Sequence, residues 1–397
     1  MLANNIAVPS FSSWASPCLL VSKPDRTFRF CTDYRKVNAV TKPDSYPLPR
    51  MEDCIDMVGA ASFVSKFDLM RGYWQVPLTP RVAEISAFVT PGGLFSFQVM
   101  SFGLRNAPST FQRLINKVIL GLEGCAAYLD DVVIFSDSWE QHVVRMSALF
   151  RRLAEAGLTV NLAKCEFARA TVTYLGKVVG RGEVRPVNAK IIAISNYPVP
   201  TSKKELMRFL GMAGFYRGFC SNFSSVVAPL TNLLKGKALY IWSDSCQAAF
   251  DEVKHLLSSA PVLAAPCMER SFSLQVDASA VGAGAVLLQR DESGVDRPVG
   301  YFSRKFQIKF QINYSTIEKE ALALVWALQH FEVYVGNDAV PLVVYTDHNP
   351  LTFLTSLQCP NQRLMRWCLF LQAYWLDVRH IKGRDNVLAD ALSRAPV

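Results

Sequence analysis

The sequence contains no two cysteines at the Cys-x-x-Cys spacing, and its ten cysteines lie singly along the chain from Cys18 to Cys368. This scatter excludes a zinc ribbon or knuckle, and a secreted disulfide scaffold would be much denser in cysteine. No apolar run approaches the roughly 18 residues that a membrane span requires. The N-terminus, MLANNIAVPSF, lacks the basic start and long apolar core of a signal peptide. We therefore expect an intracellular protein with reduced thiols and no membrane partner.

Charged residues make up only 19% of the chain, and neither sign dominates strongly. Lys and Arg exceed Asp and Glu by 42 to 33, which gives a net charge of +9. This excess is compatible with a polyanionic partner but does not establish one. Half of the 397 residues are hydrophobic. A chain of this length is too long for a single domain with one hydrophobic core, so two or three domains are expected.

Short β-rich runs are mixed with periodic helical runs, which is typical of α+β or α/β domains. Turn-forming residues 91–93 predict a hairpin over residues 87–99, and Asn106 with Pro108 predicts a helix over 106–120. Pro261 and Pro266 bracket the best candidate for an interdomain linker. The other expected elements are strands at 18–22, 28–32, 64–69, 128–135, 159–162, 172–179, 272–277, 282–289 and 341–347, and helices at 139–156, 203–209, 226–234, 246–257 and 318–331.

The stretch AAYLDDVVIFSD places two neighbouring carboxylates, Asp130 and Asp131, inside an apolar strand. Burying them without compensation would cost several kcal/mol. Adjacent strand residues point to opposite faces, so both can serve one pocket only at a hairpin tip. Asp68 ends another strand-like run, and pairing of the two strands would bring three carboxylates to one edge. Such a cluster suits two Mg²⁺ ions roughly 4 Å apart, and the alternative is a hydrated surface hairpin.

A second set of acids is spread over the last third of the chain. Asp277 follows the strand-like FSLQV, Asp347 closes VVYTD, and Asp390 lies in NVLADALSR. Glu318 and Glu320 open a helical run, and at 100° per residue both flank its apolar stripe. Each acid also has a structural explanation, as a strand-end cap, a first-turn acid or a solvated helix residue. Periodicity leaves the choice between Glu318 and Glu320 open.

Several motifs occur in order along almost the whole chain: SKFDLMRGYWQVPL, AFVTPGGLFSFQVMSFGLRNAPSTFQRLIN, YLDDVVIFS and TYLG. In them the sequence resembles the reverse transcriptase of gypsy-type (Ty3/gypsy, Metaviridae-like) long-terminal-repeat retrotransposons, which is part of a Pol polyprotein. The resemblance implies an α+β right-hand polymerase with fingers, palm and thumb, followed by an α/β RNase H-like domain. It places fingers and palm at residues 1–179, a helical thumb at 180–261 and the RNase H-like domain at 268–397.

The resemblance also implies roles for individual polymerase residues. Asp68, Asp130 and Asp131 would be the metal-binding carboxylates, with Asp68 and Asp130 as the principal ligands. Tyr73 would be the steric gate that excludes a ribonucleotide 2′-hydroxyl, whereas from its pattern alone it is a core aromatic. Lys23 and Arg29 would contact the incoming triphosphate, since cations suit phosphate oxygens. Arg35 is expected to be structural, and residues 174–176 would form the primer grip.

In the RNase H-like domain the resemblance implies that Asp277, Glu320, Asp347 and Asp390 bind two Mg²⁺ ions. It favours Glu320 over Glu318, because Glu320 directly precedes the A-L-A-L run. His380 lies ten residues before Asp390. Many RNases H carry a loop histidine at that place that assists product release, whereas gypsy-type relatives often have another residue.

These roles imply an RNA-directed DNA polymerase with ribonuclease H activity, using two Mg²⁺ ions per active site, with Mn²⁺ as a possible substitute. The expected partners are an RNA or DNA template with a DNA primer, RNA–DNA hybrid and dNTPs. Basic thumb residues, among them Lys203 and Lys204, would hold the backbone without reading bases. The expected location is intracellular, in a cytoplasmic virus-like particle with nuclear access. The alternatives are a decayed or domesticated copy that only binds nucleic acid, and a ribonuclease H alone.

Three positions depart from the family pattern. Ser101 stands where proline is usual, Trp74 where histidine is frequent, and Phe28 where tryptophan is common. None removes a metal ligand, so the departures concern efficiency more than reaction type. In relatives a helix and a strand precede the segment SSWASPCLLVS. We therefore expect incomplete fingers, with weak polymerase and near-normal hybrid cleavage.

Overall fold

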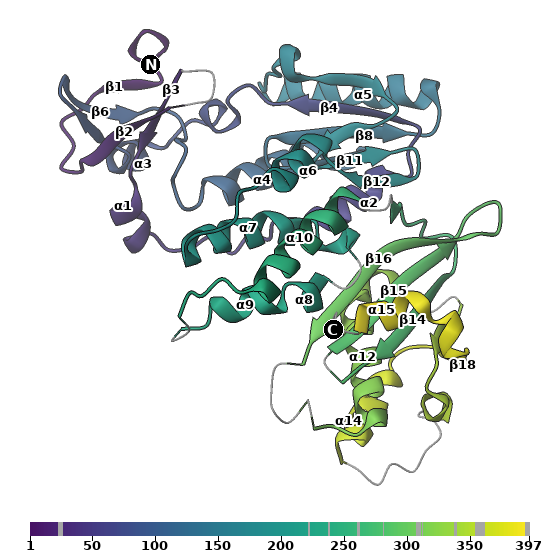
Figure 1. Ribbon diagram of the computed structural model, residues 1–397. Coiled ribbons are helices and arrows are strands. Elements are labelled where there is room, and N and C mark those ends of the chain that lie inside the picture. The colour runs from purple at the N-terminus through teal and green to yellow at the C-terminus, as the bar shows by residue number, and fades with distance from the viewer. Residues whose placement is uncertain are drawn as a thin grey trace. The chain divides into compact units, whose positions relative to one another are not determined.

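The computed structural model describes residues 1–22, 27–220, 223–236, 239–259, 263–280, 282–306, 311, 313–336, 340–353 and 362–393. Contacts within the chain divide it into two compact units, Met1–Leu175 and Gly176–Val397. The helices and strands of both units are shown in Figure 1. Within the described ranges, no helix combines the length and the apolar character needed to cross a bilayer.

The first unit contains two β-sheets with helices packed on them. Its elements are η1 Leu2–Asn4, β1 Ala7–Pro9, β2 Ser16–Ser22, β3 Phe28–Thr32, α1 Arg35–Val40, α2 Met51–Gly59, β4 Phe63–Asp68, η2 Gly72–Gln75, α3 Pro80–Ile85, β5 Phe88–Thr90, β6 Gly93–Phe97, α4 Ala107–Ile119, β7 Cys125–Tyr128, β8 Asp131–Ser136, α5 Trp139–Glu155, η3 Leu162–Lys164, β9 Glu166–Arg169 and β10 Val172–Tyr174.

The N-terminal sheet has the strand order β1-β6-β5-β2-β3. The expected hairpin is confirmed, since β5 and β6 pair antiparallel and turn through residues 91 and 92. Aromatic side chains form much of its core, with the tilted rings of Phe88 and Phe97 at a centroid distance of 4.8 Å. The expected strands at 18–22 and 28–32 are confirmed as β2 and β3.

The second sheet of this unit has the order β7-β8-β4-β9, and helices α4 and α5 pack on it (Figure 1). Both helices were expected, and the Ser138 side chain caps α5 by accepting a hydrogen bond from the Gln141 N–H. Phe67 of β4, Phe111 of α4 and Ile134 of β8 are fully buried in the shared core. The rigid core therefore supports the strand ends that carry Asp68 and Asp131.

Three sequence expectations differ from the structure. The expected strand at 128–135 is interrupted, because residues 129 and 130 form the turn between β7 and β8. In the expected strand at 159–162 only Val160 makes a β-bridge, with Leu69, and η3 begins at Leu162. The expected strand at 172–179 is two strands, because Leu175 and Gly176 have positive φ angles and break the extended chain.

In its described part, the second unit contains a five-stranded sheet, a smaller group of paired strands and more helices than the first unit. Its elements are β11 Lys177–Gly180, β12 Glu183–Pro186, α6 Asn188–Ser195, α7 Lys203–Phe215, η4 Arg217–Phe219, α8 Phe223–Val226, α9 Ala228–Leu233, α10 Asp244–Ser258, β13 Leu263–Ala264, β14 Phe272–Ala278, β15 Gly282–Arg290, β16 Asp296–Lys305, α12 Thr316–His330, α13 Glu332–Val335, β17 Leu342–Thr346, η5 Asn349–Phe353, α14 Gln362–Leu371, β18 Leu376–His380, η6 Gly383–Asp385 and α15 Val387–Ser393.

Helices α6 to α10 belong to the same compact unit as the C-terminal sheet. Strand β13 lies within the expected linker and pairs with β12, which in turn pairs with β11. The Ser224 hydroxyl of α8 also donates a hydrogen bond of 2.7 Å to the Ser303 carbonyl of β16. The helical segment and the C-terminal sheet are therefore in direct contact.

The C-terminal sheet has the order β16-β15-β14-β17-β18. Strands β14, β15 and β16 are antiparallel, whereas β14 pairs parallel with β17, and β17 with β18. Every residue of β15 from Gly282 to Gln289 is buried. Because successive strand residues point to opposite faces, both faces of the sheet are covered there. Helices α12 and α15 both pack against β14 and β15 (Figure 1).

Helix α12 is buried more completely than the sequence suggested. An amphipathic helix was expected over 318–331, but every residue from Glu320 to Leu328 is buried. A helix that is enclosed on all sides carries no solvated stripe, and its apolar periodicity is correspondingly weak. It packs on β14 and β15 and also contacts α14 and η5. The carboxylate of Glu320 is consequently shielded from solvent.

Candidate active sites

The hairpin between β7 and β8 places Asp130 and Asp131 at its tip. Tyr128 and Asp131 are the last pair of the ladder, and Leu129 with Asp130 makes the turn. Leu129 adopts a left-handed conformation with φ 55°. The sequence expectation that two adjacent aspartates must lie at a hairpin tip to serve one pocket agrees with this geometry.

Asp68 lies at the end of β4, directly opposite Asp131 in the antiparallel ladder. The N–H of Leu69 donates a hydrogen bond of 3.2 Å to the carbonyl of Asp130, which joins the turn to the end of β4. The sheet thus brings Asp68, Asp130 and Asp131 to one edge.

Two lysines neutralise part of this charge. Lys66 Nζ lies 3.4 Å from Asp131 Oδ1 and also donates to the Thr173 carbonyl at 3.1 Å. Lys164 Nζ lies 3.3 Å from Asp68 Oδ2. Burial raises the pKa of Asp131, Lys66 opposes this effect, and Asp130 adds to it by repulsion. The three carboxylates share one edge and carry excess negative charge, which suits a divalent cation, but their oxygens do not all lie within 4.8 Å of one another as those of the second acidic group do.

Tyr73 lies in η2 beside this edge. Its half-buried ring packs against Phe102 and Phe111, with centroid distances of 4.9 and 5.4 Å. Burial raises the pKa of the Tyr73 hydroxyl, and the charge of Asp130 adds to the shift. The structure therefore places the Tyr73 hydroxyl within electrostatic range of Asp130, with its ring held in an aromatic cluster.

The residues expected to contact the triphosphate are Lys23 and Arg29, and the described one, Arg29, does not lie at the edge that carries the three aspartates. Arg29 is exposed on β3, in a different sheet from the three aspartates. Lys23 lies outside the described residues. Arg35 pairs with Asp33 at 2.6 Å on the surface, and its structural role stays a prediction. The Tyr174 side chain is fully buried, so a primer grip at 174–176 would present its backbone and Leu175.

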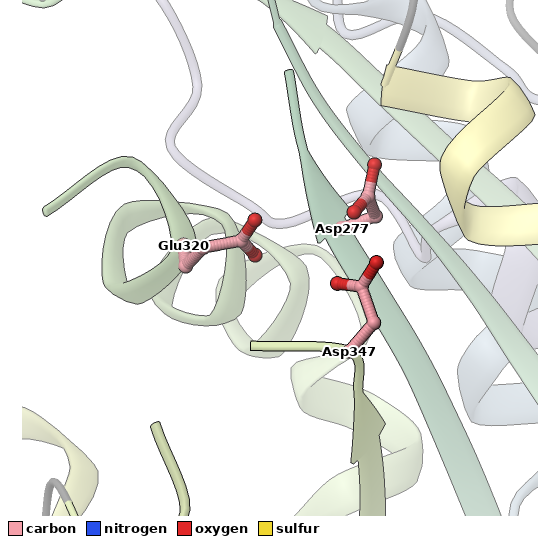
Figure 2. A group of neighbouring side chains, drawn as sticks. All are labelled: Asp277, Glu320 and Asp347. Carbon is pink, nitrogen blue, oxygen red and sulfur yellow. The ribbon is translucent and has the colours of Figure 1, made fainter. Parts of the chain in front are cut away.

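The second unit brings a separate acidic group together. Asp277 lies near the end of β14 and Asp347 directly follows β17. Because these strands are parallel, their carboxyl ends meet at one edge of the sheet. Glu320 projects from α12 toward both, and each of the three residues offers an oxygen within 4.8 Å of the other two (Figure 2). Among the described residues this is the only group of three or more potential metal ligands that meets that distance.

Glu320 is the most deeply buried acid of this group, with 3% of its surface exposed. Its Oε1 accepts a hydrogen bond of 3.2 Å from the Ala278 N–H, whereas its buried Oε2 has no hydrogen-bond partner. Burial raises the pKa of Glu320 to about 9, and repulsion from Asp277 contributes. An unpaired carboxylate oxygen beside two further carboxylates fits a bound divalent cation, which would supply the missing partner.

Glu318 serves a different purpose. Its Oε2 accepts hydrogen bonds from the backbone N–H and the hydroxyl of Ser315, both at 2.9 Å, and completes the capping box of α12. Its Oε1 pairs with Arg363 Nη1 at 2.8 Å. Both oxygens are therefore used in holding the helix start. The structure thus separates the two glutamates that periodicity left undecided.

Asp390 lies on α15 and is partly exposed, outside the group of three. The helix is fixed beside Asp277 by side-chain hydrogen bonds near both of its ends. The buried Asn386 amide donates to the Val276 carbonyl at 3.0 Å, and the Ser393 hydroxyl donates to Asp277 Oδ2. These bonds anchor the segment that carries Asp390 to the end of β14.

His380 ends β18, directly beside this edge. Its Nε2 lies 3.2 Å from the backbone oxygen of Asp347, to which the protonated nitrogen donates. The ring is exposed. A Cβ added at Gly383 would lie 3.2 Å from Asp347 Oδ2, so the loop after β18 passes close to the carboxylate. The structure therefore places His380 at the rim of the acidic group.

Sequence reasoning missed Lys66, Lys164 and Ser393, the side chains that contact the acids. Lys66 lies two residues before Asp68, so strand alternation puts both on one face, and this spacing was an available signal. Lys164 and Ser393 reach Asp68 and Asp277 across 96 and 116 residues. A local sequence pattern cannot predict contacts between residues so far apart in the sequence.

Two family models match the chain. One, described as reverse transcriptase (RNA-dependent DNA polymerase), matches residues 21–179. The other, described as RNase H-like domain found in reverse transcriptase, matches residues 267–374. They correspond to the parts of the chain that carry the first and the second acidic group.

Similar proteins include the retrovirus-related Pol polyproteins from the Drosophila melanogaster transposons 297 and opus, each 37% identical over 100% of this chain. The transposon Tf2-3 polyprotein of Schizosaccharomyces pombe is 34% identical over 96% of it. The chain spans 38%, 41% and 29% of these three polyproteins, respectively.

Among solved structures, the foamy viral protease-reverse transcriptase in complex with dsDNA matches with a TM-score of 0.86 and 23% identity, over 96% of this chain and 80% of that chain. The same protein in complex with RNA/DNA hybrid matches with a TM-score of 0.79 over 96% and 52%. This likeness confirms the expected polymerase and RNase H-like folds. The chain belongs to the reverse transcriptase and RNase H region of gypsy-type retrotransposon Pol polyproteins.

Proposed function

We propose that this chain extends a DNA primer on an RNA or DNA template and cleaves the RNA strand of RNA–DNA hybrid. The observation that carries the proposal is the presence of two acidic groups in separate units, each at the edge of a sheet in a segment matched by the corresponding family model. A protein that only binds nucleic acid gains nothing from buried, mutually repelling carboxylates.

In the first unit, Asp68 and Asp130, with Asp131 beside them, would hold Mg²⁺, or Mn²⁺ in its place. Divalent ions bound there would activate the primer 3′-hydroxyl and stabilise the leaving pyrophosphate. Tyr73 would lie against the sugar of the incoming dNTP and exclude a 2′-hydroxyl. Lys23 and Arg29 would bind the triphosphate oxygens.

In the second unit, Asp277, Glu320 and Asp347 would hold Mg²⁺, and Asp390 would complete the ligand set from α15. Divalent ions bound there would activate a water molecule for attack on an RNA phosphate. His380, at the rim of the group, would assist departure of the cleaved end. Ser393 would orient Asp277 through the hydrogen bond to Oδ2.

We further propose fingers and palm at residues 1–179, a thumb at 180–261 and an RNase H-like domain at 268–397. The helices of the thumb segment offer Lys204, which is exposed at the start of α7, for contact with the nucleic-acid backbone. Lys203 Nζ donates to the Lys235 carbonyl at 3.1 Å, so part of its role is to hold the helices together.

The test is primer extension on an RNA template with dNTPs and Mg²⁺, run beside cleavage of an RNA–DNA hybrid labelled on the RNA strand. We expect both activities, each abolished by EDTA and restored by Mg²⁺. Single-stranded RNA and double-stranded DNA serve as uncleaved controls. Binding of primer–template without either activity would refute the proposal in favour of a binding protein, and cleavage without extension would support a ribonuclease H alone.

A further inference from the structure

The turn that carries Asp130 and Asp131 holds an unfavourable backbone conformation. Leu129 has a φ angle of 55°, a region that a residue with a Cβ atom occupies at a cost in free energy. The two aspartates directly follow this residue. Any relaxation of Leu129 would therefore move both carboxylates relative to Asp68, which lies on the adjacent strand.

Gln112 of α4 bonds the backbone on both sides of Tyr128. Its Oε1 accepts a hydrogen bond of 2.7 Å from the Leu129 N–H, and its Nε2 donates to the Ala127 carbonyl at 3.0 Å. The second Nε2 hydrogen is donated to Asn116 Oδ1 at 2.8 Å. If the Gln112 side-chain amide were rotated by 180°, its NH₂ group would face the Leu129 N–H, and two donors would oppose each other. The hydrogen bonds therefore fix the orientation of the amide.

Gln112 has no exposed surface and is flanked by the buried apolar side chains of Phe111 and Ile115, with Asn116 one helical turn further along. A buried amide is unfavourable unless its donors and acceptor are paired. An apolar residue would pack in this core without that requirement. A polar side chain is therefore needed here to pair with the backbone groups of Ala127 and Leu129.

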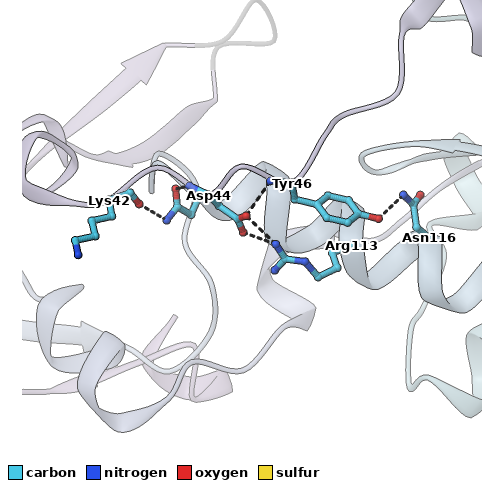
Figure 3. Close-up of polar contacts among 6 residues, drawn as sticks. Lys42, Asp44, Tyr46, Arg113 and Asn116 are labelled. Atoms are coloured by element: carbon cyan, nitrogen blue, oxygen red, sulfur yellow. Dashed lines mark hydrogen bonds and ion pairs between the residues drawn. The ribbon is translucent and has the colours of Figure 1, made fainter.

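The helix that carries Gln112 is itself held by an extended segment, residues 42–46 (Figure 3). Asn116 donates to the Tyr46 hydroxyl at 2.8 Å. Arg113 reaches both carboxylate oxygens of Asp44 at 2.7 Å, and its guanidinium lies 4.8 Å above the Tyr46 ring. Gln112 and Asn116 thereby connect the turn to the 42–46 segment through three consecutive hydrogen bonds.

We propose that Gln112 is the positioning residue of the polymerase site, setting the place of Asp130 and Asp131 by clamping Leu129 and Ala127. Asn116, Tyr46 and the Asp44–Arg113 pair hold α4 so that the clamp has a fixed base. The proposal rests on the polymerase function proposed above, and it assigns Gln112 no contact with substrate or metal.

The first test compares Gln112→Met, which has a similar shape and no hydrogen-bonding amide, with the unchanged chain. We expect kcat for dNTP incorporation to fall by about 10²-fold, as for a displacement near 1 Å. The Mg²⁺ concentration for half-maximal extension should rise, whereas hybrid cleavage stays within about twofold, because its acids lie in the other unit. Extension within about twofold of the unchanged chain would overturn the proposal.

A matched control removes another buried glutamine that clamps backbone. Gln289 of β15 accepts from the Cys267 N–H at 2.9 Å and donates to the Cys267 carbonyl at 2.7 Å. Gln289→Met loses comparable hydrogen bonds in the second unit. It should lower stability without changing kcat for extension or its Mg²⁺ dependence. An equal loss of extension in both variants would reduce Gln112 to a general stability role.

Amide hydrogen exchange provides a readout that needs neither metal nor activity. The Leu129 N–H should exchange at least about tenfold faster in Gln112→Met, while amides in the middle of β4 and β8 keep their protection. Unchanged exchange at Leu129 would refute the clamp even if extension were lost. If the chain without any substitution had no polymerase activity, the proposed function would be refuted. The exchange rate of the Leu129 N–H would still show whether Gln112 holds the turn.

A second variant, Gln112→Glu, covers the case in which Gln112→Met does not fold. A neutral carboxyl group has the size of the amide, and it can accept from Leu129 and donate to Ala127. The ionised form cannot donate, and burial raises the pKa of such a group. The ratio of the variant kcat to the unchanged kcat should therefore fall as pH rises from 6.5 to 9. A ratio that stays near one throughout would overturn the proposal.

Discussion

Glu318 and Glu320 lie two residues apart on α12, and their carboxylates do different things. Glu318 caps the helix through Ser315 and pairs with Arg363. Glu320 faces Asp277 and Asp347 and leaves one oxygen without a hydrogen-bond partner (Figure 2). Helical spacing places the two side chains far apart around the helix axis, so one secures the helix while the other belongs to the acidic group.

This pair gives a matched test of the ribonuclease site. Glu320→Gln should lower hybrid cleavage by at least about 10²-fold, since losing a metal ligand costs no less than losing an outer-shell partner. Glu318→Gln keeps a capping side chain and loses the charge opposite Arg363 at a buried position, so stability should fall by roughly 1.5–3 kcal/mol with cleavage retained. Initial rates on labelled hybrid and urea unfolding provide the two measurements. The reverse pattern would make Glu318 the ligand.

The stability of the metal-free protein should depend on pH through Glu320. Its pKa of about 9 in the folded chain exceeds the usual value of 4.5. Between these values the folded protein retains a proton that the unfolded chain releases, so the free energy of unfolding contributed by this group falls as pH rises. Urea unfolding in EDTA from pH 5 to 9 should show this decline. Glu320→Gln should flatten it, whereas Glu318→Gln should not; an unchanged slope in Glu320→Gln would contradict the assignment.

The two acidic groups should be separable by substitution. Asp130→Asn should abolish nucleotide addition and leave hybrid cleavage, because it removes a ligand from one group only. Asp277→Asn should do the reverse. Each variant is its own control, since the surviving activity reports that the chain is folded. If either substitution silenced both activities in a folded chain, the assignment of two independent sites would be wrong.

Tyr73→Ala should admit ribonucleotides, because the ring proposed to exclude the 2′-hydroxyl is removed. We expect the ratio of kcat/KM for dNTP over NTP to fall by at least about tenfold, which measures discrimination in the transition state. Tyr73→Phe retains the ring packed on Phe102 and Phe111 and should keep the ratio. Retained selectivity in an active Tyr73→Ala variant would return Tyr73 to a packing role.

Binding to the nucleic-acid backbone should be sensitive to salt and insensitive to sequence. Neutralising one phosphate contact lowers the slope of log K against log salt by about 1. Lys204→Gln should show this change, whereas Lys203→Gln should also lower stability, because Lys203 bonds the Lys235 carbonyl. Titrations of labelled hybrid at several salt concentrations measure the slope. A footprint that favours one sequence at physiological salt would support a domesticated binding protein.

Much of the fold was predictable because local patterns determine it. The β5–β6 hairpin, α4, α5 and β14 follow from turn residues, caps and alternation. The expectation of one strand at 172–179 was wrong because Leu175 and Gly176 both have positive φ angles. Gly176 was an available turn signal, whereas a leucine gives none. The turn at Leu129 is of the same kind. Both are left-handed leucines, and the Leu129 N–H is bonded to the Gln112 side chain.

The acids of both groups were identifiable from the sequence, but the contacts that hold them were not. Helical periodicity places Glu318 and Glu320 equally well beside the apolar stripe, and only the family resemblance favoured Glu320. In the structure, the ion pair of Glu318 with Arg363 and the proximity of Glu320 to Asp277 distinguish them. Gln112 was missed because one glutamine in an otherwise ordinary helix carries no signal without its partners at Ala127 and Leu129. Such contacts depend on packing between segments distant in the sequence.

The parallel pairing of β14 with β17 has a consequence for folding kinetics. The strands join residues near 274 and 344, and α12, enclosed between its neighbours, occurs between them in the sequence. Such non-local pairing forms slowly, because loop closure precedes the gain from contacts. Asp277, Glu320 and Asp347 therefore assemble only when the sheet closes. Divalent-cation binding at this edge should accordingly appear late in refolding, after most helical structure has formed, and would serve as a kinetic marker for closure of the sheet.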